Sequence, residues 1–493
     1  MDASTTLAVD PQTANVIVDH VLRYAPTGIN VKIIGAGVGG LLSALECWRK
    51  GHDVEVLERA PALSHIGDTI TPGPSGIVVF KHYPTMLEEY TKLSVKAKLY
   101  AYSLEGQAVG RPQEFEWNQQ DVAEHVAHPI HVPMAISRSD LVEILYDQCQ
   151  RLGIPVRWGV SIKDYEEDSH LQAGIAVSGD ERFSADVVVA ADGLGSKSHK
   201  LILGENVRAV PTGYTIYRAA LWTRDLKNAP LLQEAVRDGQ AAVTRFYLGH
   251  NIHIVFVIST RFIALNITLP DVDQGPIVES WSSTITREEM MARIPNIESL
   301  DPYIVEAIRC FPQNSIVAWR LCMRDPQRTW TSQAGHVVQV GDSAHSYVPT
   351  SGSGGTMAME DAITLAECLR LAGRDHVGIA TKTYQLLRQP RTQLTQLMGL
   401  RNRAVWHTAS ALQAMELRKL TVFGKWVWIH DAEKYAKLNF HKARAHLETG
   451  AEFQNTNLPP GYRYEPWTIQ KEVEREKNGV KSDLTSNGDW SLV

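Results

Sequence analysis

The sequence has little of what defines several protein classes. It contains five cysteines in 493 residues, without C-x-x-C spacing, and their odd number argues against a disulfide framework or a zinc knuckle. No run approaches the roughly 18 apolar residues of a membrane-spanning helix. The start of the chain lacks the basic and apolar segments of a signal peptide. We therefore expect a cytoplasmic protein with no transmembrane segment.

The sequence also lacks an excess of positive charge and the spacing of metal ligands. The formal net charge of −6 gives no basic field to attract a polyanion, so nucleic-acid binding is not expected. His345 has no H-x-x-x-H partner, and no G-x-S-x-G elbow follows a strand. A metal site and hydrolase chemistry are therefore disfavoured, while the oligomeric state is left open.

The segment Val31–Ile34 predicts a buried strand that runs directly into glycines. Gly35 permits a tight turn, Gly37 lets backbone amides approach a pyrophosphate, and Gly40 lets the following helix press against the strand. That helix is expected over Leu41–Lys50, and its N-terminus would attract the anion. A G-x-G-x-x-G pattern is weak by itself, because glycine-rich turns are common.

A second strand and an acidic residue strengthen this interpretation. Asp53–Leu57 predicts the strand, and Glu58 follows it at about the 20-residue separation expected of an acid that binds a ribose hydroxyl. The alternative is that Glu58 merely ends a strand at the surface. The order of strand, glycines, helix, strand and acid favours an adenine dinucleotide. It does not distinguish NAD from FAD.

The pattern along the chain predicts a mixed α/β (α+β) fold. Between about residues 206 and 320, β-rich runs separated by short breakers predict an antiparallel sheet. A Rossmann-like domain thus appears on both sides of a sheet that would bind the substrate. The expected ranges are a leader at 1–29, the nucleotide-binding domain at 30–205 and 321–400, the sheet domain at 206–320, C-terminal helices at 401–451, and a polar, peripheral tail at 452–493.

Two later segments carry further motifs. The segment Val187–His199 ends a strand with Asp192-Gly193, and Val337–Ala362 ends another with Gly341-Asp342. Together with G-x-G-x-x-G, they resemble the three fingerprints of the class A flavoprotein monooxygenases, the p-hydroxybenzoate hydroxylase superfamily. The stretches VPTSGSGGTMAMEDA and WVWIHDAEKYA are similar to its fungal salicylate hydroxylase-like branch, whose members often act in secondary metabolism. The resemblance implies noncovalently bound FAD, with NADPH or NADH as a transient co-substrate.

The last motif also suits a flavin on physical grounds. Asp342, at the end of a strand, is placed to accept hydrogen bonds from a polyol such as the ribityl chain. Gly354 and Gly355 would bring backbone amides, and the N-terminus of a helix over Thr356–Leu371, close to the ring. Reduced flavin is anionic there, so the helix end would stabilise it. The alternative is that Asp342 only caps a turn.

Three further residues gain a role only through the resemblance. Asp192 corresponds to the family element that touches both FAD and the pyridine nucleotide. Arg138 matches an arginine that contacts FAD, although an exposed arginine leading a helix would be the commoner case. His199 stands where the family usually has arginine, and this puts the bracing of the motif and its NADPH contacts in doubt.

Substrate residues are expected on the antiparallel sheet. Strand alternation over Tyr214–Trp222 places Arg218 among largely apolar neighbours, where a guanidinium needs an anion or an acceptor. Arg218 also matches a substrate-pocket arginine of related fungal hydroxylases; the alternative is an internal salt bridge. Tyr247 is a second candidate, which could hydrogen-bond a phenolate or carbonyl, or be an ordinary sheet tyrosine. His253 is a third candidate for the same cavity, although a lone sheet histidine is more often structural.

The sequence therefore predicts an FAD-dependent monooxygenase. By resemblance, NAD(P)H reduces FAD, O2 forms a flavin C4a-hydroperoxide, and one oxygen passes to a small-molecule substrate. The expected substrate is an electron-rich phenol, aromatic polyketide or indole. The alternatives are epoxidation of an isoprenoid olefin, an oxidase of the same fold, or a non-catalytic dinucleotide-binding protein.

Overall fold

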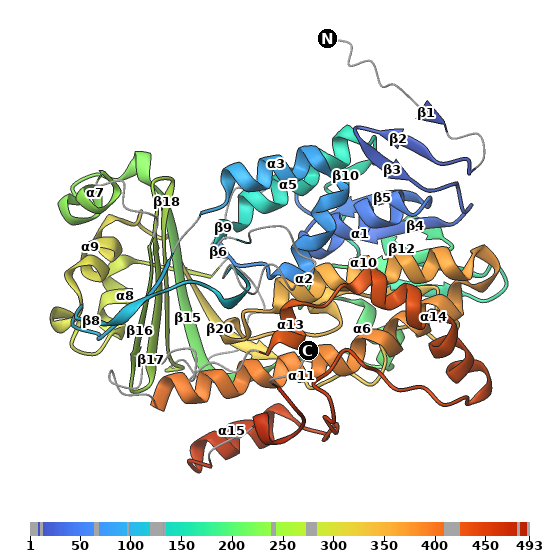
Figure 1. The fold of residues 1–493 in the computed structure, drawn as a ribbon. Coiled ribbons are helices and arrows are strands. Elements are labelled where there is room, and N and C mark those ends of the chain that lie inside the picture. Colours follow the sequence, from blue (N-terminus) through green and yellow to red (C-terminus); the bar gives the residue numbers. More distant parts are fainter. Residues whose placement is uncertain are drawn as a thin grey trace, which may run out of the picture.

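A five-stranded parallel sheet forms the centre of the larger domain (Figure 1). The computed structural model describes residues 8–9, 13–63, 69–95, 98–118, 132, 135–237, 243–272, 283–408, 424–480 and 484–490. The strand order is β10 (Val156–Trp158), β5 (Asp53–Glu58), β4 (Asn30–Ile34), β14 (Val187–Ala190) and β21 (Val337–Gln339), and all neighbours are parallel. Because the carboxyl ends of parallel strands share one edge, the motifs that follow β4, β5, β14 and β21 meet there.

Both faces of this sheet are covered, which explains its Val- and Ile-rich strands. Val187 and Val189 face one core cluster, whereas Val188 and Ala190 face another. The first cluster is built with helices α1 (Val38–Arg49), α5 (Arg138–Arg151) and α10 (Gly354–Ala372). The second is covered by an antiparallel sheet of β11 (Asp164–Asp168), β12 (Ala173–Ser178) and β13 (Glu181–Ala185).

An eight-stranded sheet forms the second layer of the molecule, on the left in Figure 1. Its order is β19 (Thr284–Ile285), β20 (Ile316–Met323), β15 (Val210–Trp222), β18 (Phe262–Pro270), β17 (Ile252–Ile258), β16 (Val243–Gly249), β7 (Lys98–Tyr102) and β8 (Ala108–Gln113). Pairing is antiparallel, except that β7 runs parallel to β16. The predicted sheet therefore also takes in two strands from outside 206–320.

Helices enclose the eight-stranded sheet on its two faces. One face packs against α7 (Pro230–Arg237), α8 (Arg287–Arg293) and α9 (Pro302–Cys310). The other meets the long helix α11 (Val377–Thr408), which runs beneath both domains in Figure 1. This helix passes through the expected boundary at residue 400. The parallel sheet resumes with β21 after the eight-stranded sheet, so the predicted fold class, with its interrupted domain, is confirmed.

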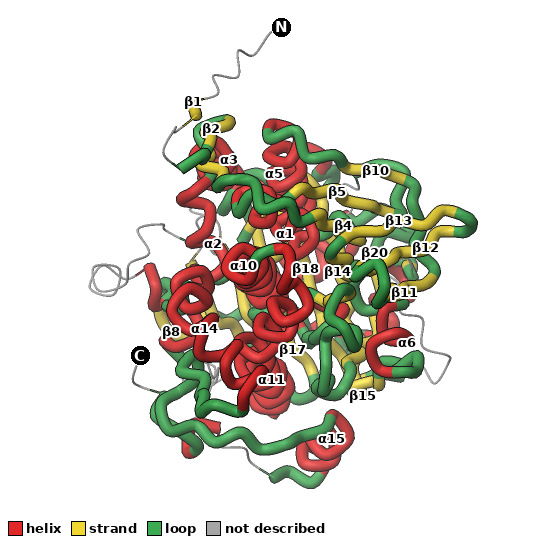
Figure 2. The backbone as a smooth tube through the Cα atoms, turned by 90° about the vertical axis from the view of Figure 1, so that its right-hand side faces the viewer, coloured by secondary structure: helices red, strands yellow, loops and turns green. Residues whose placement is uncertain are grey.

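The C-terminal region is more firmly packed than its polar composition indicates. Helices α13 (Lys425–Trp428) and α14 (Ala432–Thr449) precede α15 (Ile469–Lys477). Figure 2 shows α14 beside α10 and α11, with α15 below α11. Trp467, Ile469 and Leu484 are buried in a cluster with Ile216 of β15, so the part of 452–493 that is described includes core residues as well as surface ones.

The remaining strands and α-helices of the described residues are short. They are β1 (Ala8–Val9), β2 (Val16–Val18) and β3 (Val21–Arg23), which form a small antiparallel sheet within the expected leader, the pair β6 (Thr69–Ile70) and β9 (Ile136–Ser137), and helices α2 (Pro74–Ile77), α3 (Pro84–Leu93) and α6 (Ser198–Leu203). No helix in the described ranges has the length and apolar character needed to cross a membrane.

Candidate active site

The glycine loop joins β4 to α1 in a space that has no room for side chains at two positions. Gly35 has φ +109°, and a Cβ there would lie 2.4 Å from the Ala191 carbonyl oxygen. A Cβ at Gly40 would lie 1.9 Å from the Gly35 carbonyl oxygen. At Gly37, by contrast, a Cβ would meet no atom of the described residues within 4 Å. The loop is therefore closed toward the protein at Gly35 and Gly40 and open at Gly37.

Glu58 lies at the end of β5, directly beside this loop. Its Oε2 accepts a hydrogen bond from the Ala36 amide at 2.7 Å, and its Oε1 accepts one from the Ala60 amide at 2.8 Å. These bonds fix the carboxylate at the sheet edge. A carboxylate has about four acceptor positions, so two bonds leave Glu58 with capacity for a ligand hydroxyl.

Asp342 lies in the single 3-10 turn Gly341–Ser343 that follows β21. Its side chain is exposed, although Gly341, Ser343 and the next residues are buried. The pKa of Asp342 is nevertheless raised, chiefly because the surrounding protein desolvates it, while His345, Arg138 and Arg324 act in the opposite direction. Accessible and yet surrounded by protein, the carboxylate lines a recess. Its interaction with Arg138 shows that the turn after β21 and the start of α5 meet there.

Helix α10 begins in this recess without a side-chain cap. The first turn contains no acidic residue, and the Met357 amide is bonded to the Ser353 carbonyl. The amides of Gly354 and Gly355 precede that bond and belong to the N-terminal groups that a helix leaves available. A Cβ at Gly355 would lie 2.6 Å from Cδ1 of Ile70, so β6 closes one side of the helix end.

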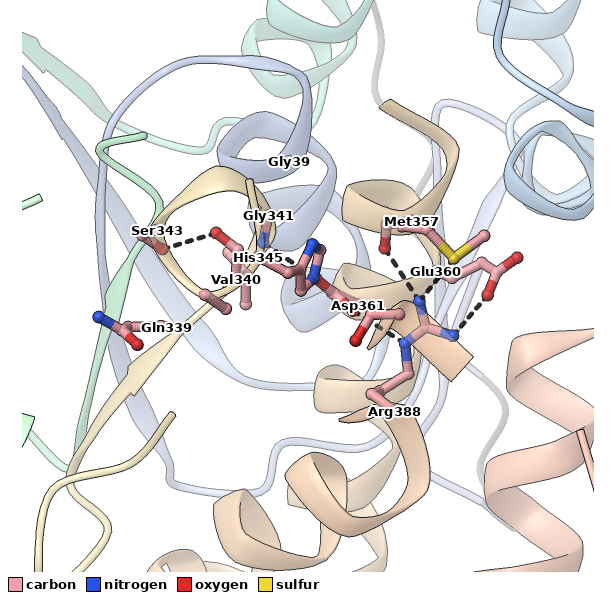
Figure 3. Close-up of polar contacts among 12 residues, drawn as sticks. Gly39, Gln339, Val340, Gly341, Ser343, His345, Met357, Glu360, Asp361 and Arg388 are labelled. Atoms are coloured by element: carbon pink, nitrogen blue, oxygen red, sulfur yellow. Dashed lines mark hydrogen bonds and ion pairs between the residues drawn. The ribbon is translucent and has the colours of Figure 1, made fainter. Parts of the chain in front are cut away.

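A buried ionic network supports the same turn from below (Figure 3). Asp361 Oδ2 accepts hydrogen bonds from the Gly341 amide at 2.9 Å and from His345 Nε2 at 2.5 Å. Its Oδ1 accepts one from Arg388 Nε at 2.8 Å. Arg388 also pairs with Glu360. Sequence reasoning did not select Asp361, although a doublet of acids within an apolar helix was a visible signal.

Asp192 follows β14 at the same edge. Its Oδ2 accepts a hydrogen bond from the Tyr165 hydroxyl at 2.8 Å, and burial raises its pKa. Asp192, Asp342, Glu58 and the glycine loop therefore surround the carboxyl ends of four adjacent strands. The predicted cofactor residues are brought together by the sheet.

The register of the eight-stranded sheet separates the two predicted substrate residues. Arg218 is opposite Asn266, Asn266 is opposite Val255, and Val255 is opposite Phe246. Directly opposed residues share a face of a sheet. Tyr247 follows Phe246 by one residue, so its side chain lies on the other face.

The surroundings of Tyr247 agree with that register. The side chain is fully buried, its hydroxyl donates to Asp301 Oδ2 at 2.7 Å, and its ring stacks on Tyr102. These contacts place it in the core beneath α9, on the side away from Arg218. The position of Tyr247 differs from the expectation that it lines the substrate cavity. Alternation along β16 decides which face its side chain occupies, and the sequence does not reveal how β16 pairs with its neighbours.

Arg218 lies on the face that turns toward the recess. Ile216, two residues before it, packs with Val348 of the segment after Asp342 and with Leu397 of α11. The Arg218 guanidinium lies over the Trp319 ring, 5.5 Å from the centroid. His253 also shares this face, because it is opposite Thr268, which is opposite Ile216.

Asn266 is a residue that sequence reasoning missed. It is the cross-strand neighbour of Arg218, and its buried Oδ1 accepts no hydrogen bond from the described residues. An amide inside the apolar run FIALNITLP of β18 was the available signal.

The recess suits an adenine dinucleotide with a flavin. The Gly35–Gly40 turn leaves open space beside Gly37, and the Asp342 carboxylate is accessible within protein. Glu58, Asp342 and the amides of Gly354 and Gly355 offer the acceptors and donors that ribose, ribityl chain and ring require. The residues present therefore fit FAD.

Comparison with known proteins decides the family. The family model described as "FAD binding domain" matches residues 28–395. The chain belongs to the class A FAD-dependent monooxygenases. Relatives of this family include the FAD-dependent monooxygenase mdpD of Emericella nidulans, 37% identical over 95% of this chain and 92% of its own, and fsr3 of Gibberella fujikuroi, 36% identical over 96% and 91%.

Two solved structures share the fold of this chain. FqzB aligns with a TM-score of 0.75 at 25% identity, over 90% of this chain and 99% of its own. CtdE, in complex with FAD and a substrate, aligns with a TM-score of 0.76 at 24% identity, over 85% of this chain and 100% of its own. The predicted family is thus confirmed, and the protein is an FAD-binding monooxygenase.

Proposed function

We propose that this monooxygenase uses NADPH or NADH, with O2, to hydroxylate an electron-rich aromatic molecule such as a phenol, an aromatic polyketide or an indole. When bound, FAD supplies the activation of O2 and the transfer of one oxygen atom. The chain supplies the binding of cofactor and substrate, their orientation and the exclusion of water.

The pairing of Arg218 with Asn266 carries the proposal. Arg218 is half-buried beside Trp319, and its planar guanidinium offers a substrate both a flat face and a fork of hydrogen-bond donors. The buried Oδ1 of Asn266 gains from a hydroxyl donor, because an unsatisfied buried acceptor costs about 1–3 kcal/mol. A phenolic substrate offers a donor and an acceptor on a flat ring, whereas an isoprenoid olefin offers neither.

The neighbouring side chains make the same face suitable for oxygen transfer. Val257, Phe262 and Ala264 form an apolar cluster with Trp222 and Phe246 on the face of the sheet that carries Arg218. An apolar lining excludes water and favours transfer of oxygen to the substrate over release of peroxide. The polar contacts of Arg218 and Asn266 would then fix which ring position reacts.

Replacement of Arg218 tests the substrate assignment. Arg218→Ala should keep its FAD, measured as flavin absorbance, and should still oxidise NADPH. With a panel of phenols, polyketides and indoles, incorporation of labelled O2 into product should fall by about 10- to 100-fold, the value of one or two hydrogen bonds to a charged group. Arg218→Lys should give an incorporation between those of wild type and Arg218→Ala, because lysine keeps the charge but lacks the planar guanidinium.

Arg224, which follows the end of β15, provides a matched control. Arg224 is 80% exposed, so Arg224→Ala should leave oxygenation unchanged. Unaltered product formation by Arg218→Ala would remove Arg218 from the substrate site. Label appearing only in olefin epoxides, or only peroxide with every aromatic tested, would overturn the aromatic hydroxylation.

A further inference from the structure

His199 lies between the two loops that carry Asp192 and Asp342. It belongs to α6, and only 1% of its surface is exposed. Its Nδ1 lies 2.8 Å from the Ser196 carbonyl oxygen, in the loop after β14. Its Nε2 lies 2.9 Å from the Ser343 carbonyl oxygen, in the turn after β21. One imidazole thus spans the ends of two neighbouring parallel strands.

Both partners of the ring are acceptors. A backbone carbonyl oxygen cannot donate, and a neutral imidazole has a single N–H. In the neutral ring, one nitrogen therefore presents its lone pair to a carbonyl lone pair. Only the protonated ring donates to both oxygens, so the two distances are satisfied together by imidazolium.

Charged groups on neighbouring elements act on this proton. Burial and the guanidinium of Arg324, which follows β20, lower the pKa of His199. The carbonyls of Ser196 and Ser343 and the carboxylate of Asp192 act in the opposite direction, and the net pKa lies below the ordinary histidine value. Mild acid therefore favours the protonated ring, which makes both hydrogen bonds. At higher pH the neutral ring, which makes one of them, prevails.

The neutral state does not leave the Ser343 carbonyl without a donor. Gln327 Nε2 also donates to it, at 3.0 Å. A second link between the strand ends is Gln339 Nε2, which donates to Ser198 Oγ at 2.8 Å. Deprotonation of His199 thus loosens the join between the loops by one hydrogen bond without separating them.

We propose that His199 is a positioning residue that, when protonated, clamps the Asp192 loop to the Asp342 turn, so that FAD is held more tightly in mild acid than at alkaline pH. A fixed cation at this position would hold the loops at every pH. Histidine makes the same contact conditional on a proton.

The rate at which FAD leaves the holoenzyme after dilution, followed by the recovery of FAD fluorescence, tests this role. As pH rises through the lowered pKa of His199, the wild-type rate should rise by about fivefold, the effect of one hydrogen bond, and most of this rise should come below about pH 6.5, the ordinary histidine value. His199→Gln, which cannot titrate, should release FAD at the fast wild-type rate throughout. His199→Arg should release it slowly throughout, because its charge is permanent.

Two features of the design isolate His199. Asp342 and Asp192 have raised pKa values of their own, and their protonation would weaken binding in acid, so each variant is compared with wild type at the same pH. His336 serves as a matched control, since its Nδ1 lies 2.8 Å from a single carbonyl, that of Asp186, away from both turns. His336→Gln should keep the wild-type profile.

The outcomes separate clearly. A His199→Gln profile parallel to wild type would overturn the proposal, as would a wild-type rate that does not change with pH. If His199→Arg does not fold, the comparison of wild type, His199→Gln and His336→Gln still decides it. Circular dichroism of each holoenzyme verifies that the variants compared are folded.

Discussion

Replacing Asp361 with asparagine would test whether the buried network supports the flavin turn. Asp361 is fully buried, and its carboxylate accepts from the Gly341 amide, His345 and Arg388, each at 2.5–2.9 Å. Removing one member of a buried ion pair costs about 3–5 kcal/mol. Asparagine retains one acceptor and Glu360 still pairs with Arg388, so we expect the lower end, about 3 kcal/mol.

The expected thermal shift follows from the size of the chain. Unfolding entropy is about 2.1 cal/mol/K per residue, which gives roughly 1 kcal/mol/K for 493 residues. A loss of about 3 kcal/mol then lowers the melting temperature by about 3 °C for cooperative unfolding. The loss of the charged acceptor at Gly341 should also weaken FAD binding by about tenfold, since such a bond contributes about 1.5 kcal/mol.

The pH dependence has a definite sign. Burial would raise the pKa of Asp361, but His345 and Arg388 outweigh it, so the pKa is lowered in the folded protein. The stabilisation is therefore complete above the unfolded-state pKa of about 3.9 and is lost as pH falls through the folded value. The folding stabilities of wild type and Asp361→Asn should differ by the full amount at neutral pH and become equal in strong acid.

Melting by circular dichroism, with and without FAD, measures these effects. Asp53→Asn is the control, because Asp53 pairs with Arg23 at 3.3 Å while 61% exposed. An exposed pair contributes about 0–1 kcal/mol, so this variant should melt like wild type. Indistinguishable melting and FAD affinity for Asp361→Asn and Asp53→Asn would refute the supporting role.

Further perturbations address the glycine loop and the eight-stranded sheet. Gly40→Ala should lose about 1–3 kcal/mol of folding stability and much of its FAD, because its Cβ would meet the loop backbone. Gly37→Ala should melt normally without FAD but bind FAD weakly. Equal behaviour of the two variants would contradict the open geometry at Gly37. Tyr247→Phe should lose about 1 kcal/mol of stability while oxygenation is unchanged, and a slower reaction would return Tyr247 to the substrate site. Burial lowers the pKa of His253 to about 3, so the folded protein favours its neutral form. His253 should therefore contribute up to about 2 kcal/mol to a fall in stability, measured by urea unfolding, between about pH 6.5 and pH 5, and His253→Phe should reduce that slope, while His52 and His407, whose pKa values are also lowered, keep the remainder.

The cofactor side of the molecule was largely predictable from sequence because its determinants are local. Gly35, Gly40 and Glu58 lie within one β-α-β unit, and their spacing fixes how strand, turn and helix meet. The later motifs end strands of the same parallel sheet, so Asp192 and Asp342 reach the same edge. The predicted helix at Leu41–Lys50 begins three residues earlier, at Val38, which is ordinary uncertainty at a helix start.

The sheet side could be predicted only in outline, because strand pairing is not local. Residues of β7 and β8, at 98–113, join a sheet whose other strands begin after residue 209. No pattern within 98–113 indicates that β7 pairs with β16. The face of a residue depends on pairing as well as alternation, since a shift of one position exchanges the faces. Arg218 and Tyr247 each had suitable neighbours in sequence. The pairing across β18 and β17 nevertheless places their side chains on opposite faces of the sheet.

The same reasoning explains why chemistry was visible at His199 and Asp361 while their roles were not. Sequence shows which group is present, but a titratable group acquires its function from what it contacts. Ser343 is 144 residues from His199, and Arg388 is 27 residues from Asp361. Both contacts converge on the turn that carries Asp342. Two supports therefore hold the backbone of the turn that carries Asp342. One is an ionic network around Asp361, and the other is the His199 imidazole, whose second hydrogen bond depends on a proton. If FAD release follows the protonation of His199 while thermal stability follows Asp361, the two supports are separable, because the first changes one hydrogen bond between loops and the second changes the charge balance of the core.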